Sequence, residues 1–486
     1  MKNTFAWDKK CPFQSVIFAI KHPTVTLIKS ISGIRGTIGG KPGTALTPVD
    51  TVKFAAAFGS WIKQRNPSIR SSIVIGRDAR ISGKMILDLV ASTLKGLGVN
   101  VIDLDLSTTP TVEVAVPMES AQGGIIITAS HNPKEWNALK LLNERGEFIS
   151  DDDGKEVLAI AESDNFSFAA VDELGGYDRN DSYLDKHIEA ILKLDLVRPD
   201  LIKTANFKIV VDAVNSTGGI FVPALLKALG ISEITELYCN PTGDFPHNPE
   251  PLPENLTAIS DKIRQTHADL GIVVDPDVDR LALVCEDGSM FGEEYTLVAI
   301  ADYVLQHTPG NTVSNLSSTI ALREVTENIN GCAYSASAVG EVNVVTKMKE
   351  TSAVIGGEGN GGVIYPALHY GRDSLVGIAL FLSYLAELKV SVSELKNRYP
   401  DYFISKNKIQ LDPEMDVDQI LRSVQKEYAE QEIDTTDGVK IYFGSEWVHL
   451  RKSNTEPIIR IYSESRNESS ANALANKIME KIRALA

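Results

Sequence analysis

Cysteine, long apolar runs and clusters of basic residues are all scarce in this chain of 486 residues. Its four cysteines, Cys11, Cys239, Cys285 and Cys332, lie far apart and lack CxxC spacing. This argues for a reducing compartment and against a zinc site or a disulfide framework built on them. No apolar run approaches the roughly 18 residues that a membrane-spanning helix needs. These absences predict a cytoplasmic protein with no membrane partner.

Positive charge is also in deficit. The chain has 48 Lys and Arg against 64 Asp and Glu, a net charge of −16, and no dense Lys/Arg run. Nucleic acid is therefore not an expected partner, because a polyanion needs a positive surface. The content of 43% hydrophobic and 23% charged residues is that of an ordinary globular protein. The length predicts about three to four domains.

Residues 1–25 are expected to form a poorly ordered extension in front of the folded protein. The short apolar run at 15–20 is faintly similar to a signal peptide, but Trp7 and Asp8 precede it. Residues 21–23, Lys-His-Pro, follow where a cleavage site needs small residues. Deleting the extension should leave activity and melting temperature unchanged.

From Thr26 onward, strand-like apolar runs alternate with amphipathic helical segments, which predicts mostly parallel sheets covered by helices. The pattern restarts twice, giving α/β domains over 26–177, 178–289 and 290–400. Antiparallel-type strands and two helices then predict a small α+β domain over 401–486. The predicted fold class is therefore α/β: three similar mixed-sheet α/β domains plus a C-terminal α+β domain around a central cleft.

Ser130 follows a short strand, Gly123-Gly-Ile-Ile-Ile-Thr128, that is expected to be buried on both faces. Asn132-Pro133 prevents further strand pairing, so the serine must lie on a sharp turn at the strand's end. A hydroxyl there projects from a rigid support into a cleft, which suits a nucleophile. The alternative is a capped turn without chemistry.

Three carboxylates at alternate positions, Asp275, Asp277 and Asp279, directly follow the apolar run Leu270 to Val274, which is expected to be buried. Such a group can converge on a hard cation, Mg²⁺ or Ca²⁺, and would repel itself without one. An EF-hand has the same spacing, with Glu286 twelfth, but Arg280 stands where glycine is needed and a β-type run precedes the loop. A solvated acidic turn is the remaining alternative.

A glycine-rich segment over 356–362 presents Glu358 and Asn360. It contains a formal GxGxxG pattern, but Val363-Ile-Tyr-Pro366 follows where a dinucleotide loop would open a helix. A carboxylate and an amide can bind vicinal hydroxyls, while glycines let the backbone come close. The segment therefore suits a polyhydroxyl ligand.

Cations, hydroxyls and an amide share one loop between two strands near the C-terminus. The loop reads Arg451-Lys-Ser-Asn-Thr-Glu-Pro457, and Arg460 follows it. This is the inventory for binding a phosphate dianion. An exposed polar hairpin loop is the alternative. Together with a nucleophile, a metal triad and a hydroxyl-binding loop, it predicts phosphoryl transfer on a sugar phosphate.

These four motifs, in this order, resemble those of the α-D-phosphohexomutases over nearly the whole chain from Thr26. The resemblance implies that Ser130 is a phosphoserine. It implies that Asp275, Asp277 and Asp279, with a phosphoserine oxygen, hold Mg²⁺. Lys140 is then the candidate general acid/base.

The same resemblance assigns residues that bind the substrate. His131 and Arg35 would lie beside the reacting phosphate, and Arg280 would help to fix the sugar. The sugar hydroxyls would be bound by Glu358 and Asn360. The non-reacting phosphate would be held by residues of the last domain: Arg451, Ser453, Asn454, Thr455 and Arg460. A bisphosphorylated hexose would be both intermediate and activator, and the chain would act as a monomer or homodimer with a mobile last domain.

Departures from the family pattern favour an amino sugar. Asn360 replaces a serine and Gly362 a histidine, and Ser317 stands where the mannose/glucose branch tends to carry lysine. Glu341 stands where that branch tends to have histidine, and it could pair with a protonated amine. We therefore expect interconversion of glucosamine 6-phosphate and glucosamine 1-phosphate through a 1,6-bisphosphate.

Two alternatives stay open. One is a phosphoglucomutase/phosphomannomutase acting on glucose or mannose phosphates. The other is a non-catalytic phosphosugar-binding protein, which is disfavoured because a pure binder needs neither the nucleophile nor the three carboxylates.

Overall fold

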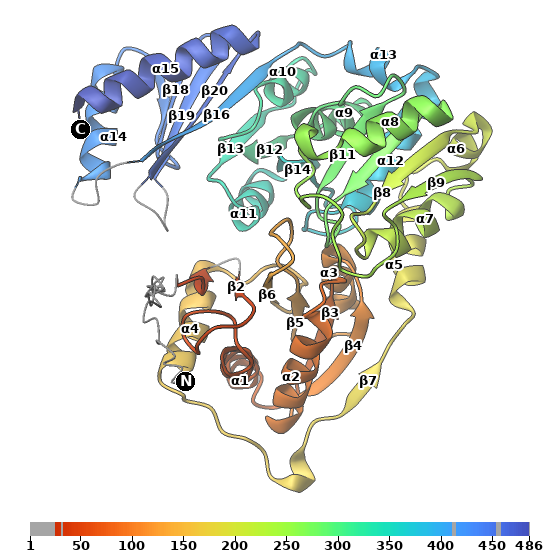
Figure 1. Ribbon diagram of the computed structural model, residues 1–486, viewed down its shortest axis with the longest axis vertical. Coiled ribbons are helices and arrows are strands. Elements are labelled where there is room, and N and C mark those ends of the chain that lie inside the picture. Colours follow the sequence, from red (N-terminus) through yellow and green to blue (C-terminus); the bar gives the residue numbers. More distant parts are fainter. Residues whose placement is uncertain (1–24, 31–32, 411–414, 453–457, 486) are drawn as a thin grey trace, which may run out of the picture.

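The computed structural model describes residues 25–30, 33–410, 415–452 and 458–485, arranged around four β-sheets (Figure 1). Residues 1–24 of the expected extension lie outside the described residues, as do Ser453, Asn454 and Thr455 of the expected phosphate loop. Among the described residues, no helix is long and apolar enough to cross a membrane.

The first sheet is mixed and has the order β1-β2-β6-β5-β3-β4-β7. Strand β3 is parallel to both β4 and β5, and β5 is antiparallel to β6. The central strand β5 is buried throughout, as its three isoleucines predict. The strands are β1 (Ile28–Ser30), β2 (Gly33–Thr37), β3 (Ser72–Arg77), β4 (Asn100–Leu106), β5 (Gly123–Ile127), β6 (Trp136–Leu142) and β7 (Tyr177–Arg179). The helices that accompany them are α1 (Pro48–Arg65), α2 (Gly83–Gly96), α3 (Thr109–Met118) and α4 (Asp151–Glu162).

The second sheet, β11-β10-β8-β9, carries the acidic motif. Strand β10 is parallel to β8 and antiparallel to β11, and every residue of β10 is buried. The strands are β8 (Lys208–Asp212), β9 (Glu233–Leu237), β10 (Leu270–Val274) and β11 (Leu281–Cys285). The helices are α5 (Tyr183–Leu192), α6 (Pro199–Ala205), α7 (Gly218–Ala228) and α8 (Thr257–Thr266).

The third sheet, β13-β12-β14-β15, shares one hydrophobic core with the second. Its strands are β12 (Thr312–Asn315), β13 (Tyr334–Ser337), β14 (Ile355–Glu358) and β15 (Gly362–Ile364). Its helices are α9 (Glu293–His307), α10 (Ala321–Glu327), α11 (Glu341–Thr351), α12 (Ser374–Leu388) and α13 (Val392–Lys396). In Figure 1 the second and third sheets lie above the first.

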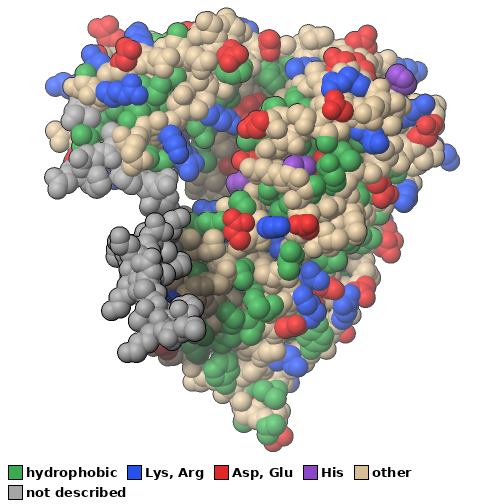
Figure 2. Space-filling model, in the orientation of Figure 1, with side chains coloured by type: hydrophobic (Ala, Val, Ile, Leu, Met, Phe, Trp, Pro, Cys, Tyr) green, Lys and Arg blue, Asp and Glu red, His purple; other side chains and the backbone are tan. Residues whose placement is uncertain are grey.

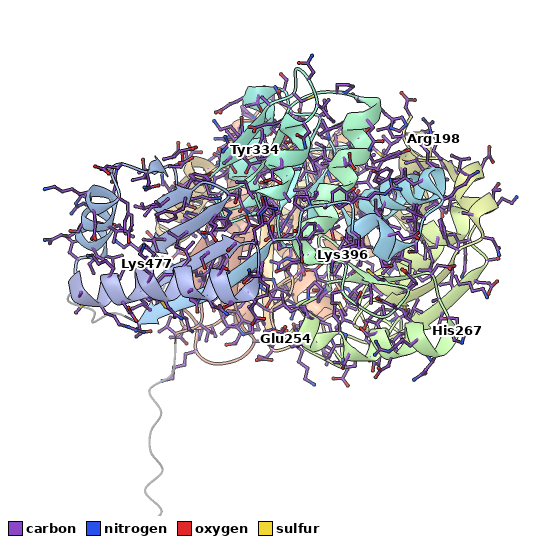
Figure 3. All side chains as sticks on the ribbon, turned by 90° about the horizontal axis from the view of Figure 1, so that it is seen from above. Arg198, Glu254, His267, Tyr334, Lys396 and Lys477 are labelled. Carbon is purple, nitrogen blue, oxygen red and sulfur yellow. The ribbon has the colours of Figure 1, made fainter. Side chains whose placement is uncertain are left out.

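The fourth sheet, β16-β20-β19-β18-β17, is antiparallel throughout and has its own core. Its strands are β16 (Phe403–Gln410), β17 (Glu432–Asp434), β18 (Val439–Phe443), β19 (Glu446–Lys452) and β20 (Ile458–Ser465). Its helices are α14 (Val417–Glu427) and α15 (Glu468–Leu485), and both contribute to the hydrophobic core of this sheet. Seen from above, Lys477 of α15 lies at one end of the molecule and Arg198 and His267 at the other (Figure 3).

The predicted fold class is confirmed: three mixed sheets with helices precede an antiparallel α+β unit. The space-filling surface is hollowed between the fourth sheet's unit and the first sheet (Figure 2). The exact division of the chain at residues 177, 289 and 400 stays a prediction.

The glycine-rich segment is less of a loop than expected. Its first half belongs to β14, and Gly362 already begins β15. The two strands pair directly, with Gly357 opposite Val363. A Cβ on Gly357 would lie 2.0 Å from the carbonyl oxygen of Gly362, so the close pairing depends on glycine.

Candidate active site

Ser130 lies on a turn held by buried hydrogen bonds just beyond β5. Its φ of 48° is in the left-handed region, and its backbone N–H donates to Thr128 Oγ1 at 2.9 Å. The buried Arg80 guanidinium donates to the carbonyls of Ser130, Asn132 and Pro133. The turn therefore presents the serine hydroxyl in a fixed direction.

The Ser130 hydroxyl reaches the acidic motif of the second sheet. Ser130 Oγ donates to Asp275 Oδ2 at 2.8 Å, although 145 residues separate the two. Ser130 is 8% exposed, so the contact is nearly closed to water. The predicted nucleophile and the first carboxylate of the triad thus share one site.

Asp275, Asp277 and Asp279 converge in the loop between β10 and β11. One oxygen of each lies within 4.8 Å of the others, and all three side chains are buried. Burial and repulsion by the other two carboxylates raise the pKa of Asp275 well above its usual value. Among the described residues, Oδ1 of Asp277 and Oδ1 of Asp279 have no hydrogen-bond partner. Buried carboxylate oxygens without donors fit a divalent cation, so the triad could bind a metal.

Lys140 is a cation beside the same carboxylates. Its Nζ lies 2.7 Å from Asp277 Oδ2 and 3.4 Å from Asp279 Oδ2. Burial alone would lower the pKa of Lys140, but attraction to Asp277 and Asp279 outweighs burial and raises it. In this arrangement Lys140 is protonated at neutral pH and can donate hydrogen bonds.

His131 is a neutral group next to the serine. Its Nδ1 is 3.4 Å from Ser130 Oγ, and its Nε2 is 4.0 Å from Glu250 Oε1. Burial, reinforced by the charge of Arg280, lowers the pKa of His131 to about 3. Arg280 also faces Glu250, at 3.6 Å. His131 is therefore neutral at pH 7 and can hydrogen-bond to the Ser130 hydroxyl without adding a positive charge.

Arg372 joins the metal loop to the sugar segment, and sequence reasoning missed it. Its guanidinium contacts Asp279 Oδ2 at 2.7 Å, Glu341 Oε2 at 3.0 Å and Glu358 Oε2 at 2.9 Å. Its backbone N–H also donates to Glu341 Oε1. Both oxygens of Glu341 therefore already accept from Arg372. Asn360 Oδ1 accepts from the backbone N–H of Gly362 at 3.3 Å and helps to close the turn.

Arginines from the first and fourth sheets, Arg35 of β2 and Arg460 of β20, lie near enough for their charges to interact. Burial and the charge of Arg460 lower the pKa of Arg35. Arg35 Nε is buried and has no hydrogen-bond partner among the described residues. Arg451, opposite Arg460 in the β19–β20 ladder, pairs with Asp437 at 2.8 Å. Two guanidiniums near each other favour an anion between them.

Four family models match consecutive parts of the chain. They describe phosphoglucomutase/phosphomannomutase alpha/beta/alpha domains I, II and III at residues 27–168, 181–288 and 292–402, and the C-terminal domain at residues 407–481. The chain belongs to this family. The expected family, that of the α-D-phosphohexomutases, and its enzyme class, an intramolecular phosphotransferase, are confirmed.

Relatives with different printed substrates match nearly the full length. A phosphoglucomutase/phosphomannomutase of Thermococcus kodakarensis is 36% identical over 446 residues, covering 90% of this chain and 95% of the relative. A probable phosphoglucosamine mutase of Methanopyrus kandleri is 32% identical over 456 residues, covering 93% and 97%. A crystal structure of a phosphoglucomutase/phosphomannomutase family protein from Burkholderia thailandensis superposes with a TM-score of 0.81 at 28% identity, covering 95% of this chain and 97% of that one.

The candidate active site brings together most of the residues predicted from the sequence. Around the serine and the acidic triad lie His131, Lys140 and Arg280, and Arg372 links Glu358 to them. Three contributors were missed: Arg80, Glu250 and Arg372. Arg80 ends the run Gly76-Arg-Asp-Ala-Arg80, where a charged residue just past a buried strand was the available signal.

Proposed function

We propose that this phosphohexomutase interconverts glucosamine 6-phosphate and glucosamine 1-phosphate through a phosphoserine at Ser130. The observation that carries the proposal is the 2.8 Å contact between Ser130 Oγ and Asp275 Oδ2, beside two buried carboxylate oxygens without donors. A hydroxyl placed against a set of buried carboxylates that fits a divalent cation suits phosphoryl transfer better than simple binding.

Each half-reaction exchanges one phosphorus–oxygen bond for another. The free hydroxyl of the sugar phosphate attacks the phosphorus of phosphoserine, and the bond from phosphorus to Ser130 Oγ breaks. The hydroxyl proton leaves the sugar, and Ser130 Oγ takes up one proton. After the 1,6-bisphosphate reverses its orientation, its other phosphoryl group returns to Ser130. The sum is an isomerisation with no net loss of phosphate.

The chain's own groups have distinct tasks in this scheme. Protonated Lys140 donates a hydrogen bond or a proton to the oxygen that leaves phosphorus. Arg35 and Arg460 bind phosphate oxygens from opposite sides of the hollow. Mg²⁺, held by Asp275, Asp277 and Asp279, would offset the charge of the phosphoryl group.

An amino sugar is favoured by the charges near the sugar segment. Two buried carboxylates, Glu341 and Glu358, share the single guanidinium of Arg372, which Asp279 also contacts. A protonated amine at C2 would balance the excess negative charge. The second candidate substrate is glucose or mannose phosphate. It is favoured by the Thermococcus kodakarensis relative and by the occupation of both Glu341 oxygens by Arg372.

Comparative kinetics test both levels of the proposal. With Mg²⁺ and the matching hexose 1,6-bisphosphate, we expect the highest kcat/KM on glucosamine 1-phosphate. A preference for glucose 1-phosphate by orders of magnitude would overturn the choice of substrate but not the mutase. Binding of all hexose phosphates without exchange of label between C1 and C6 would overturn the mutase itself.

A further inference from the structure

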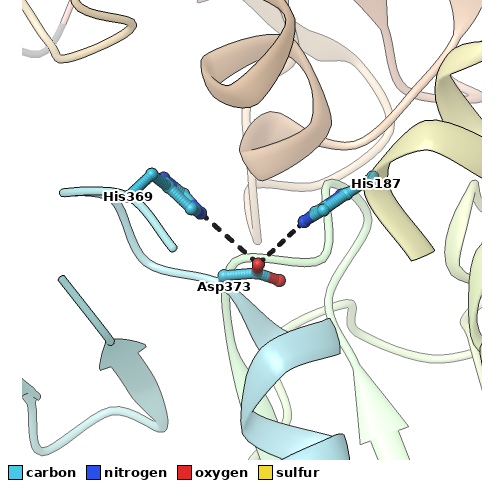
Figure 4. A group of neighbouring side chains, drawn as sticks. All are labelled: His187, His369 and Asp373. Atoms are coloured by element: carbon cyan, nitrogen blue, oxygen red, sulfur yellow. Dashed lines mark hydrogen bonds and ion pairs between the residues drawn. The ribbon is translucent and has the colours of Figure 1, made fainter. Parts of the chain in front are cut away.

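Two histidines and an aspartate meet where the first three sheets' units join (Figure 4). His187 belongs to α5, and Asp373 caps the N-terminus of α12, four residues after His369. His187 Nε2 lies 3.0 Å and His369 Nε2 lies 3.4 Å from Asp373 Oδ2. His187 and Asp373 are fully buried.

These separations are those of ligands around one metal ion. Two ligand atoms about 2.1 Å from an ion, at angles of about 90–110°, lie about 3.0–3.4 Å apart. The ligating atoms of all three side chains also lie within 4.8 Å of one another. Asp373 Oδ1 is engaged by the first N–H groups of α12, which leaves Oδ2 for the cluster.

The other nitrogen of each ring faces a partner on α3. His187 Nδ1 lies 2.9 Å from Thr111 Oγ1, whereas His369 Nδ1 faces Glu113 Oε2 at 3.4 Å without a hydrogen bond among the described residues. Metal-binding histidines are usually oriented by such a partner on the second nitrogen, often a carboxylate. The α3 helix thus provides the outer contacts of a metal site.

The surroundings of Glu113 independently indicate a cation near this cluster. It is 1% exposed, and neither of its carboxylate oxygens has a hydrogen-bond partner among the described residues. A buried carboxylate without donors is costly. A cation bound by His369 would polarise the ring N–H towards Glu113 and compensate that cost.

We propose that His187 Nε2, His369 Nε2 and Asp373 Oδ2 bind a structural transition-metal ion of the Zn²⁺ class, separate from the Asp275–Asp279 triad. Two imidazoles and one carboxylate select such an ion over Mg²⁺, which prefers oxygen ligands alone. The three ligands come from the second and third units and the outer contacts from the first. The ion therefore clamps the three units together.

The clamp lies directly behind the active site. The first residue of α3, Thr109, donates to Asp277 through its side chain and its backbone N–H. The helix that orients both histidines thus also supports the carboxylate triad. The inference does not depend on which hexose phosphate the enzyme uses.

Cobalt titration of the chelator-treated full-length enzyme tests the proposal. With millimolar Mg²⁺ present to occupy the oxygen site, we expect one equivalent of Co²⁺ to bind, with visible absorption bands and a higher melting temperature. Asp277→Asn should keep the bands, because the triad is a different site. His267→Gln, at an exposed histidine, is the matched control and should also keep them.

Variants of the cluster supply the decisive comparison. His369→Gln should weaken Co²⁺ binding by more than the roughly 10- to 100-fold expected for Glu113→Gln, which changes only the partner of one ring nitrogen. Asp373→Asn keeps an N-capping side chain and should also lose the bands. Wild-type protein that shows no bands and no added equivalent would overturn the proposal and leave a hydrogen-bonded cluster without metal. So would folded His369→Gln protein that binds Co²⁺ like the wild type.

Discussion

A single buried guanidinium shapes the turn that presents Ser130, the proposed nucleophile. Arg80 pairs with Asp78 at 3.0 Å and donates to carbonyls of the serine turn and the residues that follow it. Lysine carries the same charge but cannot donate in several fixed directions. The shape of the turn is therefore encoded 50 residues upstream of Ser130.

Arg80→Lys should destabilise the protein by about 2–4 kcal/mol, because several buried carbonyls lose their donors. The measurement is chemical denaturation followed by circular dichroism. Arg70→Lys is the control, since the Arg70 guanidinium also donates to carbonyls but lies at the surface. Equal stability of the two variants would contradict this account of the turn.

In the proposed function, Glu341 contributes part of the negative charge that favours an amino sugar. Glu341→Gln removes a negative charge next to Arg372, so kcat/KM for glucosamine 1-phosphate should fall by about tenfold relative to glucose 1-phosphate. Competition between the two substrates in one reaction measures the ratio. Glu350→Gln, on the exposed side of the same helix, should leave the ratio unchanged. An unchanged ratio in Glu341→Gln would remove Glu341 as the amine partner.

At the scale of elements, the third and fourth sheets are joined through a neutral histidine. His449 Nε2 lies 2.6 Å from the carbonyl oxygen of Asp437, and its Nδ1 lies 3.0 Å from Ser317 Oγ. The first contact requires an N–H, so Nδ1 accepts from the serine hydroxyl. Ser317, on which the prediction of an amino-sugar substrate partly rests, thus also has a structural partner, His449, in the fourth sheet.

Acid should loosen this junction. Burial lowers the pKa of His449 to about 4, although the hydrogen bond to Asp437 opposes the shift. An unfolded histidine has a pKa near 6.5, so the unfolded state binds more protons between these values. Stability should therefore fall as the pH drops from about 6.5 to about 4, by about 3 kcal/mol from this group.

Denaturation at pH 7.5, 5.5 and 4.5 measures the loss of stability. His449→Gln keeps a donor and should show a shallower loss, while His267→Gln should follow the wild type. Identical slopes for His449→Gln and the wild type would place the acid sensitivity elsewhere.

Strong periodicity makes the buried strands predictable, whereas elements that depend on tertiary packing, such as helix α3, are not. Buried isoleucine and valine runs indicate β5 and β10. Helix α3 was missed because its sequence, Thr-Pro-Thr-Val-Glu-Val-Ala-Val-Pro-Met, is rich in β-branched residues and proline. The side chain of Thr108 caps it and the core buries it, which outweighs its low propensity.

The site shows the same division. Motifs identified the nucleophile and the carboxylates, because those residue types stand at strand ends. Arg372 belongs to no motif, and its three carboxylate partners are brought together only by packing of separate units. The role of such a side chain cannot be predicted from the local sequence pattern.

At the scale of the whole molecule, the hydrophobic cores are not distributed as one core per sheet. The second and third sheets share one hydrophobic cluster, whereas the fourth sheet has a separate one. A unit with its own core and a polar junction can move or unfold separately. Substrate turnover within a closed site requires such motion.

Hydrogen exchange followed by mass spectrometry should resolve these units. Amides of β18 and β19 should exchange faster than those of β10 and α12, and a bound hexose phosphate should slow the fourth sheet most. Uniform protection across all four sheets, unchanged by ligand, would contradict a separately mobile fourth unit.

The central claim is that Ser130 hands a phosphoryl group to a hexose beside the acidic triad, and a single-turnover transfer tests it most directly. Enzyme labelled with ³²P from the bisphosphate, then mixed with glucosamine 1-phosphate, should carry the label on Ser130 by peptide mass spectrometry and lose it to sugar at the rate of turnover. Ser130→Ala should take up no label and lose at least roughly 10³-fold in kcat while keeping its fold. Full activity in Ser130→Ala, or label on another residue, would contradict the account.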